Sequence, residues 1–145
     1  MNSSRQICTF LLNGQLFGLD VDCVLEVIRS QPLTIVPLAP DAVCGLINLR
    51  GQIVTAIDLR RRLELPISQD ESTAPKMNII IKTAEGPLCF PIDDVGDVME
   101  VSTHLLEPVP ESMTGVARKM IDSVCKLPTQ LLLVLKSEFT ILAGA

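Results

Sequence analysis

The sequence lacks tryptophan and tyrosine, and its aromatic side chains are four phenylalanines. Basic residues are also few, because 12 Lys and Arg stand against 17 Asp and Glu and give a net charge of −5 at pH 7. A nucleic-acid-binding surface needs a basic face and usually aromatic side chains that stack on bases. The composition therefore argues against a nucleic-acid-binding protein.

Long apolar runs are missing as well. No run approaches the roughly 20 residues of a transmembrane helix, and the first apolar run ends at Asn13-Gly14, too early for a secretion signal. The five cysteines are odd in number and widely spaced, which is typical of free, buried thiols in a reducing compartment. The sequence thus predicts a cytoplasmic protein without direct membrane insertion, and its 48% apolar content predicts a real core.

Residues for catalysis and metal binding are equally scarce. The single histidine, His104, lies in a turn-like segment and is expected at the surface, although any Ser-His-Asp or Cys-His arrangement would depend on it. The chain has no Cys-x-x-Cys pair and no glycine-rich phosphate loop. The acidic residues between Asp93 and Glu100 lack the spacing of a calcium loop. We therefore expect no catalytic residue, no metal site and no cofactor.

The chain does contain many short, β-branched apolar segments separated by turns. Asn13-Gly14 joins two such segments and is a strong hairpin signal. The same pattern recurs around Arg50-Gly51 and around Glu85-Gly86. Ten prolines and eight glycines leave little room for a long helix. The sequence therefore predicts an all-β fold.

Three short helical pieces are expected between the strands. Apolar residues at helical spacing follow Asp20 as far as Ile28, and an apolar pair four residues apart follows Asp58. Both aspartates are expected to cap these helices. Arg60-Arg61-Arg62 is expected on a solvated face, with the steering of an acidic coiled coil as a functional alternative. The third helical turn is expected between Glu111 and Met120.

The two halves of the chain resemble each other on either side of a polar, proline-bounded linker, Pro66 to Lys76. Four short matches recur in the same order, at offsets of 70 to 78 residues. The clearest match is Asp20-Val21-x-x-Val24-x-Glu26-Val27 with Asp94-Val95-x-x-Val98-x-Glu100-Val101. The repeated order indicates a tandem duplication.

A duplicated unit of about 60 residues is marginal alone, but two such units can share a core and leave a groove where they meet. We expect subdomains at about 14–68 and 77–145, with the first strand, 7–12, as a candidate for exchange between them.

The copies differ in one respect. The second half fills the place of Asn48-Leu49-Arg50-Gly51 with a longer stretch, Ala117 to Thr129, which is expected to form a loop.

The most specific motif in the chain is Gly45-Leu46-Ile47-Asn48-Leu49-Arg50-Gly51. Further motifs are Gly14, Phe17-Gly18-Leu19-Asp20, Val24, Glu26-Val27, Pro37, Ile57-Asp58-Leu59, Asp93 to Val98, Pro108-x-Pro110 and Leu131-Leu132-Leu133-Val134-Leu135. In these residues the chain resembles the CheW family of chemotaxis adaptors, from about Ile7 to Leu142.

The resemblance implies two SH3-like five-stranded barrels around a shared hydrophobic core, and a scaffold that is not an enzyme. Members of the family couple the cytoplasmic tips of methyl-accepting chemotaxis receptors to the histidine kinase CheA, whose regulatory domain is a homologue. The expected partners are therefore such a receptor tip and a CheA-type regulatory domain. The expected location is cytoplasmic, with membrane association through receptor arrays.

The resemblance also implies a binding site for these partners. Arg50 matches the family's arginine tied to receptor and kinase coupling, whereas its spacing alone favours a solvated turn charge. Val24 and Glu26 match positions implicated in partner contacts, although spacing alone favours a core role for Val24. Glu26 is repeated by Glu100, which favours a structural role in both halves. The complete expected site comprises Arg50, Asn48, Leu49, Gly51, Glu26, Val24 and Gly45.

One alternative function stays open at this point. A stand-alone β-barrel module of this kind would bind a small ligand in a pocket at the seam between the halves. Such a pocket needs convergent polar groups inside an apolar cleft, and the sequence does not identify them.

Overall fold

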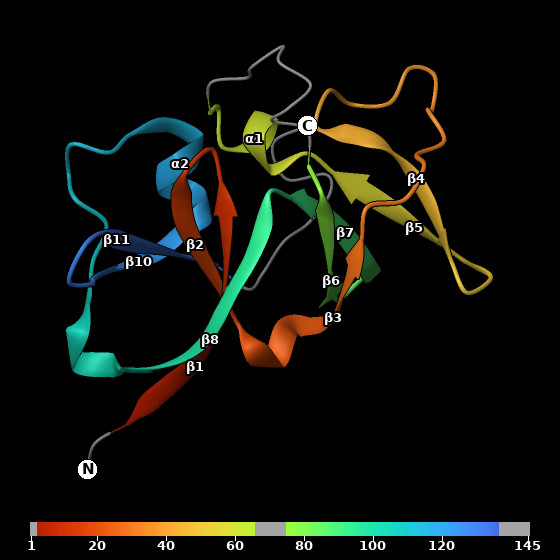
Figure 1. Cartoon of the computed structure of the whole chain (residues 1–145). Helices are drawn as coiled ribbons and strands as arrows, with labels where there is room; N and C mark the ends of the chain where they lie inside the picture. The colour runs from red at the N-terminus through yellow and green to blue at the C-terminus, as the bar shows by residue number, and fades with distance from the viewer. Residues whose placement is uncertain (1–2, 66–74, 137–145) are drawn as a thin grey trace.

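The protein is built mainly from strands, as expected, and they form two mixed sheets. The computed structural model describes residues 3–65 and 75–136, with only the backbone described at 116 and 117. Sheet A has the strand order β8 (Asp94–Ser102), β1 (Ser4–Leu12), β2 (Gln15–Asp20), β11 (Leu131–Leu135), β10 (Ile121–Lys126) and β9 (Leu106–Glu107). Sheet B has the order β3 (Val24–Arg29), β6 (Met77–Thr83), β7 (Gly86–Ile92), β5 (Gln52–Ile57) and β4 (Val43–Leu49). The two sheets lie side by side, consistent with two SH3-like barrels (Figure 1).

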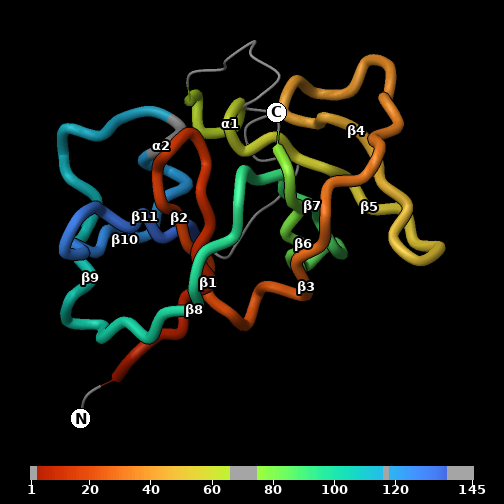
Figure 2. Tube along the Cα trace, viewed as in Figure 1, coloured from red at the N-terminus to blue at the C-terminus, as the bar shows by residue number. Residues whose placement is uncertain are grey.

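The sheets exchange hairpins between the two halves of the chain. The hairpin β1–β2 lies in sheet A with four strands of the second half, and β2 pairs in parallel with β11. The hairpin β6–β7 lies in sheet B with three strands of the first half, and β7 pairs in parallel with β5. The chain crosses between the sheets after β2 and again after β7 (Figure 2). Each half therefore completes the other's sheet, while the boundaries 14–68 and 77–145 stay a prediction.

Both sheets bring their edges together. In sheet B, the segment that follows β3 reaches β4, where Thr34 and Leu46 exchange two backbone hydrogen bonds of 2.9 Å. In sheet A, β8 continues through the 3-10 turn η3 (Thr103–Leu105) into β9, which pairs with β10. Closure of this kind covers backbone groups that an open edge would leave unpaired.

The turn chemistry explains the hairpins. Asn13 and Gly14, between β1 and β2, have φ values of 52° and 77°. Arg50 and Gly51, between β4 and β5, have φ values of 50° and 86°. Two consecutive residues with positive φ are the requirement of a type I′ turn, whose twist matches that of the strands. Both predicted hairpins are confirmed, as is the third, between β6 and β7.

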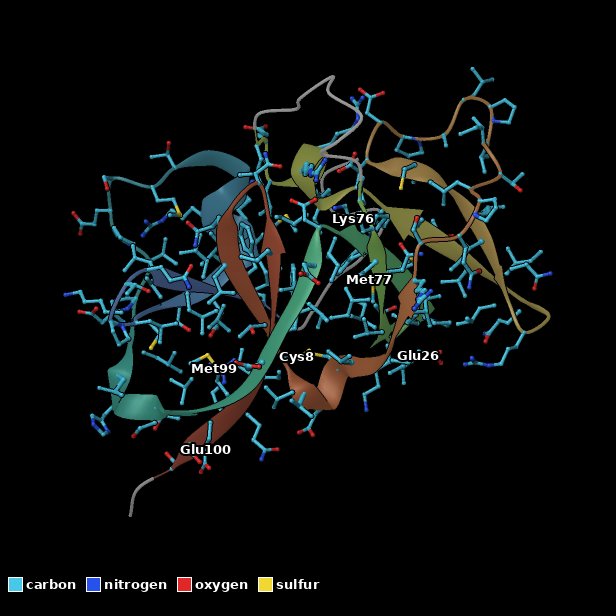
Figure 3. The ribbon with its side chains drawn as sticks, viewed as in Figure 1. Cys8, Glu26, Lys76, Met77, Met99 and Glu100 are labelled. Atoms are coloured by element: carbon cyan, nitrogen blue, oxygen red, sulfur yellow. The ribbon has the colours of Figure 1, made fainter. Side chains whose placement is uncertain are left out.

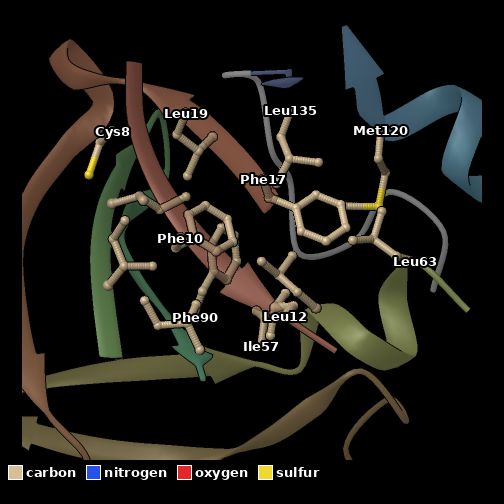
Figure 4. Packing of buried hydrophobic residues seen from close by; sticks show 14 of the residues in the cluster. Cys8, Phe10, Leu12, Phe17, Leu19, Ile57, Leu63, Phe90, Met120 and Leu135 are labelled. Carbon is tan, nitrogen blue, oxygen red and sulfur yellow. The ribbon is translucent and has the colours of Figure 1, made fainter. Parts of the chain in front are cut away.

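The shared core lies between the sheets. Its buried residues come from both sheets and include Phe10 and Phe17 of sheet A, whose rings stack at a centroid distance of 6.0 Å, and Phe90 of sheet B. Leu63 and Met120 close the same cluster (Figure 4). Smaller clusters belong to one sheet each: Ile7, Leu16, Val101, Cys125, Leu132 and Val134 in sheet A, and Ile47, Leu49, Val54, Ala56, Ile80 and Cys89 in sheet B. The expected shared core is thus present.

The prediction of a helix behind Asp20 is wrong. Only a 3-10 turn, η1 (Val21–Cys23), follows Asp20, and the chain then enters β3. The carboxylate of Asp20 makes no capping bond and instead accepts two hydrogen bonds, of 3.0 and 2.9 Å, from Arg5. Of the apolar residues that suggested one face of a helix, Val24 and Ile28 pair with β6, and this tertiary pairing overrides the helical spacing.

The helix behind Asp58 is confirmed, but its arginines are not all solvated. Asp58 accepts hydrogen bonds from the backbone N–H groups of Arg60 and Arg61 and begins α1 (Leu59–Arg62). Arg61 is exposed, as expected. Arg60 is buried and forms an ion pair with Asp93, because its side chain turns toward the other sheet.

The second half contains α2 (Gly115–Met120), close to the expected third turn. The stretch 117–129 is not a plain loop, since it ends α2 and contains all of β10. Most of the expected linker, 66–74, lies outside the described residues.

Candidate functional site

The centre of the expected site is the two-residue turn between β4 and β5. Arg50 occupies its first position, and the side-chain oxygen of Asn48 accepts a 2.9 Å hydrogen bond from the backbone N–H of Gly51. Arg50 has a left-handed backbone conformation, and its side chain is 69% exposed. Asn48 and Gly51 therefore hold the turn that presents Arg50 to solvent.

The Arg50 guanidinium forms a two-pronged ion pair with Glu26. Nη1 donates to Oε1 at 3.1 Å, and Nη2 donates to Oε2. Glu26 lies on β3, one edge of sheet B, and Arg50 follows β4, the other edge. Figure 3 labels Glu26 on its strand. Because the sheet curls, the pair spans the closure of the barrel and joins two residues that lie 24 positions apart in the sequence.

The electrostatics of this pair keep both groups charged. The hydrogen bond from Arg50 lowers the pKa of the Glu26 carboxyl, and the hydrogen bond to Glu26 raises the pKa of Arg50. Water screens an exposed pair strongly, so its contribution to the free energy of unfolding is small. The arrangement is therefore better suited to presenting a fixed, charged surface than to holding the fold together.

The remaining expected residues lie around this pair in different ways. Leu49 is buried in the core of sheet B, and Gly45 is buried where β4 meets Thr34. Val24 is half-buried and packs against the shared core. The structure thus brings Arg50, Glu26, Asn48 and Gly51 together at the surface, whereas Leu49 is buried next to the turn and Gly45 lies near the other end of β4.

Two exposed apolar residues beside the pair were missed by the sequence reasoning. Leu25, 54% exposed, lies between Val24 and Glu26, where the register of β3 against β6 shifts. A bulge of this kind redirects a side chain. Ile53, 70% exposed, faces Asn48 across the β4–β5 hairpin. Successive side chains on a strand point to opposite faces, so placing the apolar Val54 in the core would have predicted that Ile53 is exposed.

Glu100, the repeat of Glu26, has a different partner. Its carboxylate accepts a 2.8 Å hydrogen bond from the Ser4 hydroxyl, across β8 and β1. The two glutamates occupy corresponding strands, since β3 pairs with β6 and β8 pairs with β1. Among the residues that the structure describes, only the first half therefore combines this glutamate with an arginine at a hairpin turn.

The cysteines and the histidine form no reactive cluster in the described part of the chain. All five cysteines are free, four are buried, and burial raises the pKa of Cys44 to about 11 and that of Cys89 to about 12. His104 is exposed and bonds Ser102 at 2.6 Å. Across residues 3–65 and 75–136, no group of three or more His, Cys, Asp or Glu residues is placed to hold a metal ion.

A cavity of about 330 Å³ lies at one end of sheet B. Leu33, Cys44, Asn78 and Pro91 are among its lining residues, and all of its lining belongs to sheet B and the segments that adjoin it. None of these lining residues belongs to sheet A, whereas a small-ligand module was expected to have its pocket at the seam between the halves. In the part of the chain that the structure describes, no helix is long and apolar enough to cross a membrane.

Comparisons with known proteins agree with the fold and the motif. The CheW-like domain model matches residues 6–141. The chain is 31% identical over 132 residues to the chemotaxis protein CheW of Treponema pallidum, covering 90% of this chain and 78% of that protein. It is 30% identical over 138 residues to the chemotaxis protein CheW of Bacillus subtilis, covering 95% and 87%. The scaffolding protein TtCheW from Thermoanaerobacter tengcongensis has a similar crystal structure, with a TM-score of 0.82, 27% identity, and coverage of 94% and 92%. The chain belongs to the CheW-like domain family.

Proposed function

We propose that this protein is a non-catalytic adaptor that couples the cytoplasmic tips of methyl-accepting chemotaxis receptors to a CheA-type histidine kinase. The family match over residues 6–141 and the relatives named as chemotaxis proteins support this role. So does the similarity to a structure described as a scaffolding protein. The adaptor acts in the cytoplasm and reaches the membrane through its receptors.

The observation that carries the proposal is the fixed arginine at the β4–β5 turn. Arg50 is paired with Glu26 and is 69% exposed, so its guanidinium lies where a partner can reach it. A planar guanidinium with free donors pairs well with a receptor carboxylate or with backbone carbonyls at a helix end. The exposed apolar side chains of Leu25 and Ile53 supply the area that a charged pair alone lacks.

The expected site residues then divide by role. Arg50, Glu26 and Val24 contact the partner, while Asn48 and Gly51 shape the turn beneath Arg50. Leu49 and Gly45 keep β4 in place, as their burial indicates.

The two partners occupy different surfaces. The helical receptor tip lies along the seam between the sheets and extends over sheet B to the Arg50 turn, and the outer faces of the two barrels meet the kinase regulatory domain. Each interface is small and of moderate affinity, and the strength of the assembly comes from many linked contacts in an array.

A titration of the full-length protein with a soluble receptor tip tests the proposal. Arg50→Glu should weaken binding while its far-UV circular dichroism and melting temperature stay close to wild type, because the ion pair is exposed. Lys119→Glu, on α2, is the matched control, since it makes the same charge change at an exposed residue far from Glu26 in the sequence.

Saturable binding that only Arg50→Glu weakens supports the adaptor role and the site. Equal binding by both variants would remove Arg50 from the receptor interface. An absence of binding to the receptor tip and to the kinase regulatory domain alike would contradict the adaptor role. A collapse in the stability of Arg50→Glu would show that the residue is structural.

A further inference from the structure

The buried guanidinium of Arg60 joins the two sheets. Arg60 belongs to α1, directly after β5 of sheet B, and its side chain is 9% exposed. Its Nη2 donates to Oδ1 of Asp93. Asp93 lies between β7 and β8, at the point where the chain passes from sheet B to sheet A. The ion pair thus ties the helix of one sheet to the crossing that leads into the other.

Asp93 extends the connection to the first hairpin of sheet A. Its second carboxylate oxygen, Oδ2, accepts a 2.8 Å hydrogen bond from the backbone N–H of Asn13, at the β1–β2 turn. Its own backbone N–H donates to the carbonyl of Leu11 at 3.0 Å. One carboxylate therefore holds α1 on one side and the β1–β2 turn on the other.

The shared core does not make this connection redundant. Its apolar side chains, among them Leu12 and Leu63, hold the sheets against each other. The apolar driving force is non-directional, and the core sets the position of the sheets only through the close packing of its side chains. A charge-assisted hydrogen bond is short and directional, and buried ionic groups have been retained in some proteins for conformational specificity.

We propose that Arg60 is a positioning residue that, through Asp93, fixes the orientation of sheet B relative to sheet A. The consequence for function rests on the adaptor role proposed above. The Arg50 turn belongs to sheet B alone, whereas the seam and the two outer faces combine both sheets. Because the ion pair makes the two sheets move together, a displacement that one partner causes in its own sheet reaches the surface that the other partner contacts.

The first experiment tests the orientation and needs no partner. Residual dipolar couplings of backbone N–H groups report whether the two sheets share one alignment in solution. The couplings of wild type and of Arg61→Met should each fit a single alignment tensor. Arg61→Met is the control, because Arg61 is exposed and its replacement removes the same charge. Arg60→Met should need a separate tensor for each sheet. A single unchanged tensor in Arg60→Met would overturn the inference.

A second variant guards against simple misfolding of Arg60→Met. In Asp93→Asn the side-chain oxygen can still accept the hydrogen bond from the Asn13 N–H. The amide NH₂ group then faces the N–H donors of Arg60, so the bond to Arg60 is lost. Asp94→Asn is its control, since Asp94 is exposed and its carboxylate accepts a bond from the neighbouring Val95 N–H. Asp93→Asn should change the alignment in the same direction as Arg60→Met, and Asp94→Asn should leave it unchanged. The reverse outcome would overturn the role of the pair.

The second experiment measures coupling between the two partners. The dissociation constant of the receptor tip is measured with and without saturating kinase regulatory domain, and coupling between two sites typically changes affinity about 5- to 150-fold. We expect such a ratio for wild type and Arg61→Met, and a ratio near one for Arg60→Met with each separate affinity unchanged. A preserved ratio in Arg60→Met, or a ratio of one in wild type, would overturn the coupling. Absence of binding by wild type would instead contradict the adaptor role, and the dipolar couplings would still decide the orientation.

Discussion

A Cβ atom on Gly45 would lie 2.7 Å from the carbonyl oxygen of Thr34. That same carbonyl accepts the 2.9 Å hydrogen bond from the Leu46 N–H that helps to close sheet B. Gly45 also has a φ of 152°, which L-residues with a side chain rarely adopt. The close approach of two backbone segments, and not a partner, therefore accounts for glycine at this position.

Gly45→Ala should lower the free energy of unfolding by about 2–4 kcal/mol, because it adds a contact with rigid backbone to an unfavourable φ. Gly14→Ala is the control, since Gly14 has a φ of 77° but no atom of the described residues lies within 4 Å of where its Cβ would be. It should cost about 1–2 kcal/mol, from backbone conformation alone. Urea denaturation of both variants makes the comparison. Equal losses would show that Thr34 moves aside freely.

Gly96 and Thr9 make a second close approach, where β8 passes β1. The Thr9 hydroxyl donates to the carbonyl of Asp97 at 2.6 Å. If Gly96 carried a Cβ atom, that atom would lie only 2.5 Å from the same hydroxyl oxygen. Gly96→Ala should therefore be destabilising by about 1–3 kcal/mol. In the double variant Thr9→Ala/Gly96→Ala the clashing oxygen is gone, and the next atoms of Thr9 are 3.5 Å away.

The double variant should accordingly be more stable than the sum of the two single changes predicts, and a double-mutant cycle by thermal or urea unfolding measures the difference. Simple additivity would mean that β8 relaxes away from β1 without cost.

Much of the fold could be predicted because its signals are local. The turns at Asn13-Gly14 and Arg50-Gly51 require only that two neighbouring residues tolerate positive φ. The cap at Asp58 requires only that its carboxylate accept hydrogen bonds from the backbone N–H groups of the next residues, Arg60 and Arg61. Spacing failed behind Asp20, where apolar residues at helical intervals lie on β3. Whether such a segment forms a helix or a strand is decided by the neighbour it finds, and that neighbour, β6, is distant in sequence.

The site was predictable in part for the same reason. The motif around Arg50 located the turn, but the bond from Arg50 to Glu26 depends on the curl of sheet B. The three arginines of α1 look alike in sequence, yet only the fold distinguishes the buried Arg60 from the exposed Arg61. Contacts between distant segments are thus what the sequence alone left open.

Asp58 gives a prediction for the helix that carries Arg60. Its carboxylate accepts hydrogen bonds of 2.9 and 3.3 Å from the N–H groups of Arg60 and Arg61. Asp58→Ala should lower the free energy of unfolding by about 1 kcal/mol, the usual effect of losing such a cap. Asp41→Ala, at an exposed aspartate outside any helix, should change it by less than about 0.5 kcal/mol. If the two variants unfold at the same urea concentration, the cap contributes nothing.

The thiols of the half-buried Cys44 and the buried Cys89 predict a loss of stability at alkaline pH. Burial is the main cause that raises their pKa values, from 9.0 to about 11 for Cys44 and to about 12 for Cys89. Above pH 9 the unfolded chain releases these thiol protons while the folded chain retains them. The contribution of these thiols to the free energy of unfolding is therefore fully present below pH 9 and is lost as the pH rises toward 11 and 12.

Unfolding free energies measured by urea denaturation between pH 8 and 11 should thus fall more steeply for wild type than for Cys44→Ala/Cys89→Ala. Val54→Ala is the control, because Val54 lies in the same buried cluster as Cys89 and its truncation leaves a gap without removing a titrating group. Its curve should lie below that of wild type and run parallel to it. A double cysteine variant that also runs parallel to wild type would show that these thiols ionise as readily in the folded chain as in the unfolded one.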